Sequence, residues 1–189
     1  MQEWDDREII EGSKTKGKEE LAFNQLLVKY HERLYWHIRK IVLDHDDTDD
    51  VLQNTMIKVW RSLADFRSES GLYTWLYRIA TNEALSFLKQ KKKKAFAPWV
   101  DVEAQMSENL EADPWFNGDE IQLKLQQAIL KLPEKQRIVF NMKYFDQLKY
   151  EDMSEILGTS VGALKASYHH AVKKLKATLN HLGPILSKE

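Results

Sequence analysis

Apolar residues recur at steps of three or four along most of the chain, and this spacing is the strongest constraint on its fold. Such a step places the residues on one face of an α-helix. One stripe runs through 23–41, a second through 52–63, and a third through 72–88, which continues into a lysine run. No segment shows the alternation typical of a β-strand. The sequence therefore predicts an all-α protein.

Shorter helices are expected at both ends of the chain. Asp5 to Glu11 predicts a short helix that stops at Gly12. A stripe over 125–132 is followed by three further helices, since proline can open a helix and glycine can close one. Thr48 or Asp49 is the expected cap of the 52–63 helix. Pro133 or Glu134 is expected to open one of these helices. The next is expected to begin at Tyr150 and to be closed by Gly158. Thr159 or Ser160 is the expected cap of the last, which runs from Val161 to about Leu179.

Charge divides the chain into three parts. The net charge of the 189 residues is −1. Residues 1–94 carry 17 basic and 16 acidic residues (net +1), residues 95–120 carry 7 acidic and no basic residues, and residues 121–189 carry 11 basic and 6 acidic residues (net +5). The middle part also holds Pro98 and Pro114, so we interpret it as an acidic linker between two helical domains, 1–94 and 121–189.

Several classes of protein are disfavoured by what the sequence lacks. It has no cysteine, which excludes disulfides, thiolate metal sites and a cysteine nucleophile. No apolar run approaches the ~18 residues of a membrane helix, so we expect a cytoplasmic protein with no membrane insertion. A calcium loop counted from Asp44 fails, because Asp49 and Thr55 replace the required Gly and Glu. No catalytic or phosphate-binding pattern is present, so we expect neither an enzyme nor a metal or cofactor.

Residues 148–175 have the layout of a helix-turn-helix. Ser154 allows two helices to approach closely, Gly158 supplies the turn, and Val161 and Leu164 are expected to point inward. A helical hairpin that never touches DNA has the same spacing, but the net charge of +5 favours DNA binding. The residues expected to face a major groove and its phosphates are Ser160, Gly162, Lys165, Ser167, Tyr168, His169 and Lys173.

These residues resemble those of a known family, the extracytoplasmic function (ECF) sigma factors of bacterial RNA polymerase. Residues 148–165 look like the family's region four, and 132–140 are similar to its LP-x-x-x-R-x-V-F helix. Residues 49–60 resemble the polymerase-binding helix of region two, and 66–85 its promoter-opening segment. The resemblance covers about residues 5–180 and implies a sigma factor that recognises the −35 and −10 promoter elements and promotes DNA opening.

The resemblance implies that the first domain docks on the β′ coiled coil of core RNA polymerase and the second on its β flap. The residues expected to bind core polymerase are Asp49, Asp50, Gln53 and Asn54. Leu52, Met56 and Val59 are interpreted as core, and Trp60, which could serve either side, is assigned to the core in preference. The alternative for the acidic residues is a solvated helix start.

The segment 66–94 would then read and open the −10 element. Opening DNA requires stacking surfaces and hydrogen-bonding groups for unpaired bases, and cations for the backbone. Thr74, Arg78 and Asn82 are expected on one exposed face, while Trp75 is as consistent with the core as with DNA. The expected DNA-binding residues are Phe66, Arg67, Ser68, Ser70, Tyr73, Thr74, Trp75, Arg78, Asn82, Lys89, Lys91 and Lys92.

Partners follow from the same resemblance: core polymerase, promoter DNA and an anti-sigma factor, with a monomeric free protein. One departure concerns the recognition helix, where Ser167, His170 and Val172 stand at positions that are often basic in the family. Fewer cations predict a weaker and less salt-sensitive grip on the −35 element. The alternative function is a stand-alone helix-turn-helix regulator, which leaves the first domain unexplained.

Overall fold

The computed structural model describes residues 3–95 and 120–181, and these residues form α-helices joined by turns and loops, without a strand. This confirms the all-α prediction. The chain divides into two compact units, and the boundary falls between Leu88 and Lys89 in the sequence. Most of the predicted linker lies outside the described residues, but its two end residues, Ala95 and Glu120, are helical. In the described ranges, the helices are too short or too polar to cross a membrane.

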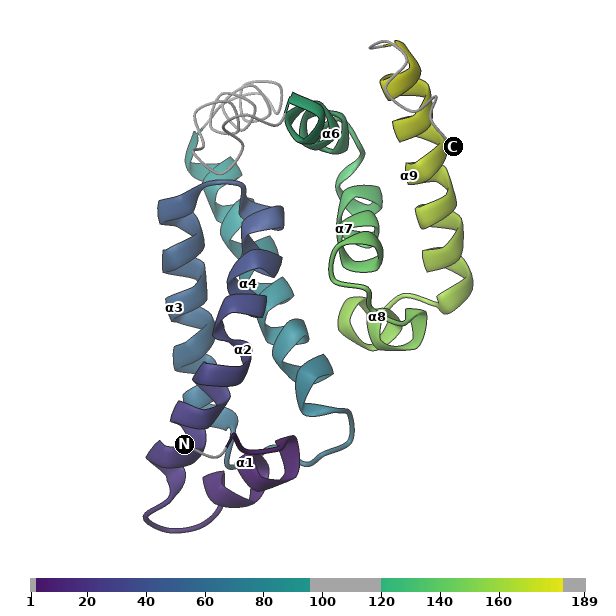
Figure 1. Cartoon of the computed structure of the whole chain (residues 1–189). Helices are drawn as coiled ribbons and strands as arrows, with labels where there is room; N and C mark the ends of the chain where they lie inside the picture. Colours follow the sequence, from purple (N-terminus) through teal and green to yellow (C-terminus); the bar gives the residue numbers. More distant parts are fainter. Residues whose placement is uncertain (1–2, 96–119, 182–189) are drawn as a thin grey trace. The chain divides into compact units, whose positions relative to one another are not determined.

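Four helices build the first unit: α1 (Asp6–Ser13), α2 (Glu19–Val42), α3 (His45–Ser62) and α4 (Leu72–Ala95). The long helices α2, α3 and α4 lie side by side, and α1 packs beside the start of α2 (Figure 1). Their facing sides bury an aliphatic core that includes Leu34, Ile38, Val59 and Leu76. This core holds the exposed faces of α3 and α4 in fixed positions.

Polar contacts set the register between the long helices. His37 Nε2 of α2 lies 2.9 Å from Thr81 Oγ1 of α4, and Thr81 Oγ1 donates to the Tyr77 carbonyl at 2.7 Å. Because a hydroxyl has one hydrogen, the His37 ring nitrogen must be the donor to Thr81. Lys58 of α3 pairs with Glu83 of α4.

The ends of the helices correct two predictions. Asp44, rather than Thr48 or Asp49, caps α3, since its side chain accepts from Asp47 N at 3.0 Å. The first of the clustered acids therefore starts this helix, and Thr48 is buried one turn inside it. Gly12 does not stop α1 but lies within it, where a Cβ atom would come within 2.5 Å of the Trp4 ring. Its role is close packing.

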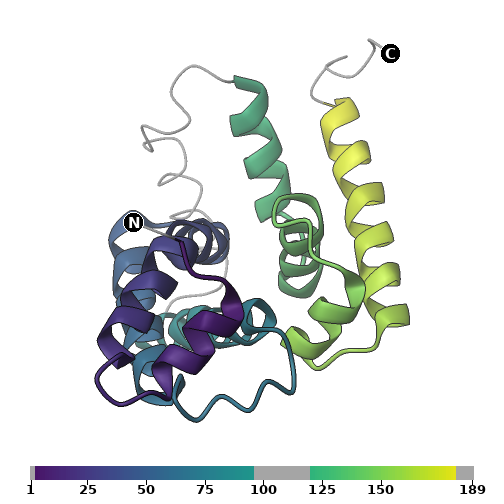
Figure 2. The same cartoon turned by 60° about the horizontal axis from the view of Figure 1, so that its bottom comes forward.

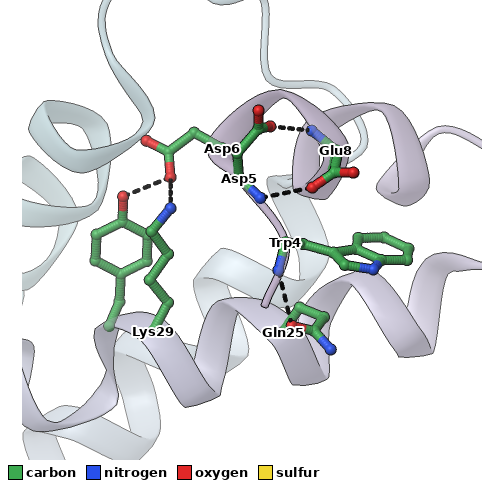
Figure 3. Close-up of polar contacts among 7 residues, drawn as sticks. Trp4, Asp5, Asp6, Glu8, Gln25 and Lys29 are labelled. Atoms are coloured by element: carbon green, nitrogen blue, oxygen red, sulfur yellow. Dashed lines mark hydrogen bonds and ion pairs between the residues drawn. The ribbon is translucent and has the colours of Figure 1, made fainter. Parts of the chain in front are cut away.

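Helix α1 is fastened to α2 by a set of polar contacts (Figure 3). Asp5 and Glu8 form a capping box at its start, with bonds of 2.8 and 2.7 Å. Asp6 Oδ1 accepts from Lys29 Nζ at 2.8 Å and from Tyr30 Oη at 2.7 Å. The Trp4 amide donates to Gln25 Oε1 at 3.2 Å. These contacts fix both the position and the direction of α1.

Tyr30 predicts a pH dependence of stability. Burial raises the pKa of its hydroxyl, and the hydrogen bond to Asp6 raises it further. The pKa of this hydroxyl is therefore higher in the folded state than the value of about 10 in the unfolded state. Its contribution to the stability of the folded state is complete below about pH 10 and is lost as the pH rises toward the folded-state pKa. Between these limits, the free energy of unfolding should fall by at most about 1.4 kcal/mol per pH unit through this group. Urea unfolding of the wild type and Tyr30→Phe at several alkaline pH values measures the difference; equal slopes would contradict the prediction.

The second unit consists of α6 (Glu120–Leu130), α7 (Glu134–Tyr144), α8 (Tyr150–Leu157) and α9 (Val161–His181). Helix α9 runs alongside α7, and α8 joins them at one end (Figure 2). Gly158 ends α8 in the left-handed conformation with φ 61°, and Ser160 Oγ accepts from Ala163 N at 3.3 Å. The predicted turn and the Ser160 cap are confirmed.

One hydrophobic cluster holds this unit together. It is built from Ile129, Phe140, Ala171 and Leu175 with their neighbours. Met153 of α8 and Leu164 of α9 are buried as well. Arg137 is also buried, 2% exposed, and its Nη1 donates to the Leu130 carbonyl at 3.4 Å. The arginine of the 132–140 motif is therefore structural, and it ties α7 to the end of α6.

Candidate nucleic-acid interface

The outer face of α3 presents the residues expected to bind a protein partner. Asp49, Asp50, Gln53 and Asn54 are all exposed, as predicted. The Asp49 carboxylate lies 3.9 Å from His45 Nε2, a contact that becomes an ion pair when His45 is protonated. This face thus offers negative charge and amide groups to another molecule.

The same face is more apolar than predicted, and the assignment of Trp60 to the core was wrong. Trp60 is 48% exposed and rests edge-on against Phe23 of α2, with ring centroids 5.0 Å apart. Ile57, one turn before it, is 42% exposed. The buried side of α3 follows Thr48, Val51, Leu52, Thr55 and Val59, whereas at about 100° per residue Trp60 falls about 20° from the exposed Asp49. Met56, also assigned to the core, is half-buried.

A pocket of about 310 Å³ lies in the first unit, where the loop 63–71 joins α3 to α4. Aromatic, hydroxyl and charged side chains meet there, so it can accept a flat, polar group. Within the loop, Ser68 has φ 57°, a left-handed conformation that L-residues rarely adopt. The lining residues are Ser62, Asp65, Phe66, Arg67, Glu69, Ser70, Trp75 and Arg78.

Two of the residues expected to contact DNA are buried. Phe66, 5% exposed, packs its ring against Trp75 at 5.0 Å and forms a wall of the pocket. Thr74 is also 5% exposed, so its placement on one exposed face with Arg78 and Asn82 was wrong. Residues four positions apart differ by about 40° around the helix axis, so Thr74, Arg78 and Asn82 do not share one direction. Thr74 lies on the side of α4 that carries the buried Tyr77 and Thr81.

The remaining residues of this set lie around the pocket and along α4. Arg67, Ser68, Arg78, Asn82 and Lys89 are exposed. Ser70, Tyr73, Trp75 and Lys91 are half-buried. Tyr73 lies between Tyr30 and Tyr77, with centroid distances of 6.4 and 4.3 Å, so it also supports the fold. Lys92 belongs to α4, but its side chain is outside the described part of the structure.

Helix α9 exposes most of the residues predicted to face DNA. Ser160, Gly162, Lys165, His169 and Lys173 are exposed, and Ser167 is half-buried. Leu164 points inward as predicted, at 1% exposed, whereas Val161 is half-buried. Tyr168 differs from the prediction, because its ring stacks on Phe140 at 5.8 Å and joins the hydrophobic cluster. Its ring is thereby fixed at the edge of the exposed face.

Tyr150 was missed as a candidate from the sequence. The ammonium groups of Lys143 and Lys165 lie 4.8 and 5.7 Å from the centre of its ring. Burial raises the pKa of the Tyr150 hydroxyl, and Tyr168 adds to the shift. Lys143 also donates to the Leu148 carbonyl at 3.0 Å. The ring therefore holds two cations near the start of α9, an arrangement that no spacing rule reveals because three helices and a turn contribute to it.

Comparison with known families identifies both units. Residues 26–94 match the model of Sigma-70 region 2, and residues 122–175 match the model of Sigma-70, region 4. The RNA polymerase sigma-H factor of Pseudomonas aeruginosa is 30% identical over 187 residues, which covers 94% of this chain and 95% of the relative. The ECF RNA polymerase sigma-E factor of Escherichia coli K12 is 31% identical over 160 residues, covering 79% and 82%.

Solved structures share the fold. CnrH, in complex with the cytosolic domain of CnrY, superposes with a TM-score of 0.68 at 21% identity, covering 93% of this chain and 97% of that one. The sigma factor RpoE from Bartonella quintana, in complex with the anti-sigma factor NepR, has a TM-score of 0.67 at 22% identity, covering 84% and 96%. At these identities the likeness establishes the helical architecture alone.

Proposed function

Because the chain belongs to the ECF group of the sigma-70 family, we propose that its two units divide the work of promoter recognition between them. The chain is an alternative sigma factor for transcription initiation. The first domain, 1–94, would bind core polymerase and open the −10 element, and the second, 121–189, would bind the −35 element. The protein would supply specificity and no catalytic chemistry of its own.

The exposed face of α3 is the proposed contact with core polymerase. Asp49, Asp50, Gln53 and Asn54 give it polar groups, while Ile57 and Trp60 give it apolar area that water would leave on binding. Interfaces commonly combine a polar rim with an aromatic anchor, and this face has both. Polar contacts would set the orientation, and Trp60 would supply most of the affinity.

The pocket beside the loop 63–71 is the proposed site for a base extruded from the −10 element. Phe66 and Trp75 offer ring surfaces, and Ser62 and Ser70 offer hydroxyl groups to the edges of a base. Arg67 and Arg78 would contact the phosphates on either side. Asp65 and Glu69 repel phosphate, so they favour entry of the uncharged base over the backbone. The mixture of groups is the observation that carries this proposal.

Helix α9 is the proposed reader of the −35 element. Its first turn is a helix N-terminus, at which Ser160 Oγ accepts from Ala163 N, and Lys165 stands one turn later beside Tyr150. The face contains few cations, so base contacts from Ser167 and His169 would matter more than charge. No observation favours the alternative of a stand-alone regulator, since that function requires neither the α3 face nor the pocket.

Lys165→Ala tests the orientation of α9. Loss of one phosphate contact should weaken binding to all −35 sequences alike and lower the slope of log K against log salt by about one. Fluorescence anisotropy of the reconstituted holoenzyme on promoter DNA, from low to high salt, measures both quantities. Lys176→Ala, an exposed lysine further along α9, is the matched control. If Lys165→Ala leaves affinity and slope unchanged, α9 does not face the DNA.

An anti-sigma factor is the proposed regulatory partner. One solved structure with this fold is a sigma factor, RpoE of Bartonella quintana, in complex with the anti-sigma factor NepR. The apolar residues of the α3 face offer one surface that an inhibitor would need to cover in order to block polymerase. Co-purification of the tagged chain from its own host, followed by mass spectrometry, tests this partner.

In vitro transcription tests the function as a whole. Core polymerase, the purified chain and a pool of genomic DNA fragments should produce transcripts whose start sites share −35 and −10 sequences. Core polymerase alone is the control. A protein that binds DNA but never associates with core polymerase in a pull-down would contradict the proposal.

A further inference from the structure

The loop that builds the pocket has little internal support. In the described chain, its main-chain hydrogen bonds lie at its two ends, from Phe66 N to the Leu63 carbonyl at 3.2 Å and from Trp75 N to the Gly71 carbonyl at 3.0 Å. The residues between them include Arg67, Ser68 and Ser70, and Ser68 is held in a left-handed conformation. A loop of this kind needs contacts from outside to keep one shape.

Helix α1 supplies that contact. Lys14, the residue that follows its last turn, donates from Nζ to the Phe66 carbonyl at 2.8 Å. Ser13 Oγ also lies 3.5 Å from the Leu63 carbonyl, but its single hydrogen is directed to the Ile10 carbonyl at 2.8 Å. The bond from Lys14 is therefore the strong link between α1 and the loop, and it carries a charged donor.

The other end of this link is fixed as well. Asp6 holds α1 to Lys29 and Tyr30 of α2, and Gly12 packs closely against Ala22 of α2 as well as against Trp4. Lys14 consequently extends from a helix whose position is set by α2. Its ammonium group fixes the Phe66 carbonyl, and the next residue in the chain, Arg67, lines the pocket.

We propose that Lys14 is a positioning residue that holds the loop 63–71 in place and thereby sets which base the pocket accepts. The inference rests on the proposed function of the pocket. Lys14 is not among the residues that line the pocket, so it acts through the main chain of Phe66. Without it, the loop would sample several shapes, and a pocket of variable shape discriminates poorly between bases.

The test compares four proteins in holoenzyme reconstituted with core polymerase: wild type, Lys14→Met, Lys14→Arg and Lys16→Met. The probes are fluorescent single-stranded oligonucleotides with the non-template −10 sequence of a promoter found by start-site mapping. For each position, four oligonucleotides differ in one base, and the ratio of the highest to the lowest Kd is measured as the base preference. Lys16 is exposed, and no hydrogen bond joins it to the loop within the described chain, so it controls for loss of charge.

Lys14→Met is expected to lower the ratio by about tenfold at one position, in line with the loss of a charge-assisted hydrogen bond. The salt slope and the melting temperature should stay at their wild-type values. Lys14→Arg, which keeps a charged donor of similar reach, should restore most of the ratio, and Lys16→Met should not change it. Rescue by arginine would separate positioning from mere support of the fold.

Three results would overturn the inference. The first is an unchanged Kd ratio in Lys14→Met. The second is an equal loss of affinity for all four bases, with a salt slope lower by about one, which indicates a direct phosphate contact. The third is a lower melting temperature in Lys14→Met that Lys14→Arg repairs without restoring the Kd ratio. A wild-type holoenzyme without base preference at any −10 position would instead refute the proposed function of the pocket.

Discussion

Replacing Trp60 by alanine is expected to weaken binding to core polymerase by about 30-fold, with the fold intact. Truncation of an aromatic anchor at an interface typically costs about 2 kcal/mol or more. Trp60 is 48% exposed and touches Phe23 at one edge, so its removal should change the melting temperature by only a few degrees. Titration of the labelled chain with core polymerase measures the affinity.

Val28→Ala is the matched control for this prediction. Val28 is 78% exposed on α2, and its position lies about 140° around the helix from Phe23, away from the Trp60 contact. Its truncation should leave polymerase affinity unchanged. Equal losses in the two variants, or none in either, would show that the α3 face is not the contact with polymerase.

Leu164→Ala should strongly destabilise the second unit. Leu164 is 1% exposed at the start of α9, and a leucine truncated in such a site costs about 3 kcal/mol. For a unit of this size, that loss lowers the melting temperature by more than about 10 °C. Transcription that depends on the −35 element should therefore fail at growth temperature, whereas the first unit should remain folded.

Circular dichroism with a thermal ramp measures this effect, and start-site-specific transcription reports its consequence. Ala166→Ser, an exposed substitution on the same helix, is the control and should behave as wild type. An unfolding curve for Leu164→Ala that superposes on that of the control would mean that α9 does not need this contact to pack.

The sequence predicted the helices well because their faces are set by local spacing. The steps of three and four predicted α2, α3 and α4, and Gly158 and Ser160 predicted the turn before α9, since a left-handed residue and a side-chain cap act within a few positions. The exposure of Asp49, Asp50, Gln53 and Asn54 followed from the same periodicity.

The errors arose where packing between helices decides burial. Trp60 was assigned to the core because it is large and apolar, yet its angular position leaves it half outside. Thr74 was placed outside because it is spaced four and eight residues from Arg78 and Asn82, yet α4 turns it toward Tyr77. The burial of both side chains depends on contacts within and between helices, such as that of Trp60 with Phe23 of α2, which the sequence alone does not show.

Five of the residues that line the pocket were among the expected DNA-binding residues, namely Phe66, Arg67, Ser70, Trp75 and Arg78, but the cavity itself and its support by Lys14 were not predicted. The pocket requires side chains from α3, the loop and α4, and the left-handed Ser68 shapes it without a glycine to announce the turn. The hydrogen bond from Lys14 to Phe66 joins residues that are 52 positions apart. Contacts over such separations depend on tertiary structure, and a single sequence contains no pattern for them.

The support of the pocket by α1 has a consequence for how relatives diverge. The main-chain carbonyl of Phe66 accepts the bond from Lys14, so this bond survives changes in the side chains of the loop. Conversely, a change at Lys14, or in the Trp4 and Gly12 packing behind it, would alter the loop while every DNA-contacting residue stays the same. If the proposal for Lys14 holds, two sigma factors with identical residues at the proposed DNA contacts would differ in promoter preference, and the mutations responsible would lie in α1, outside those contacts.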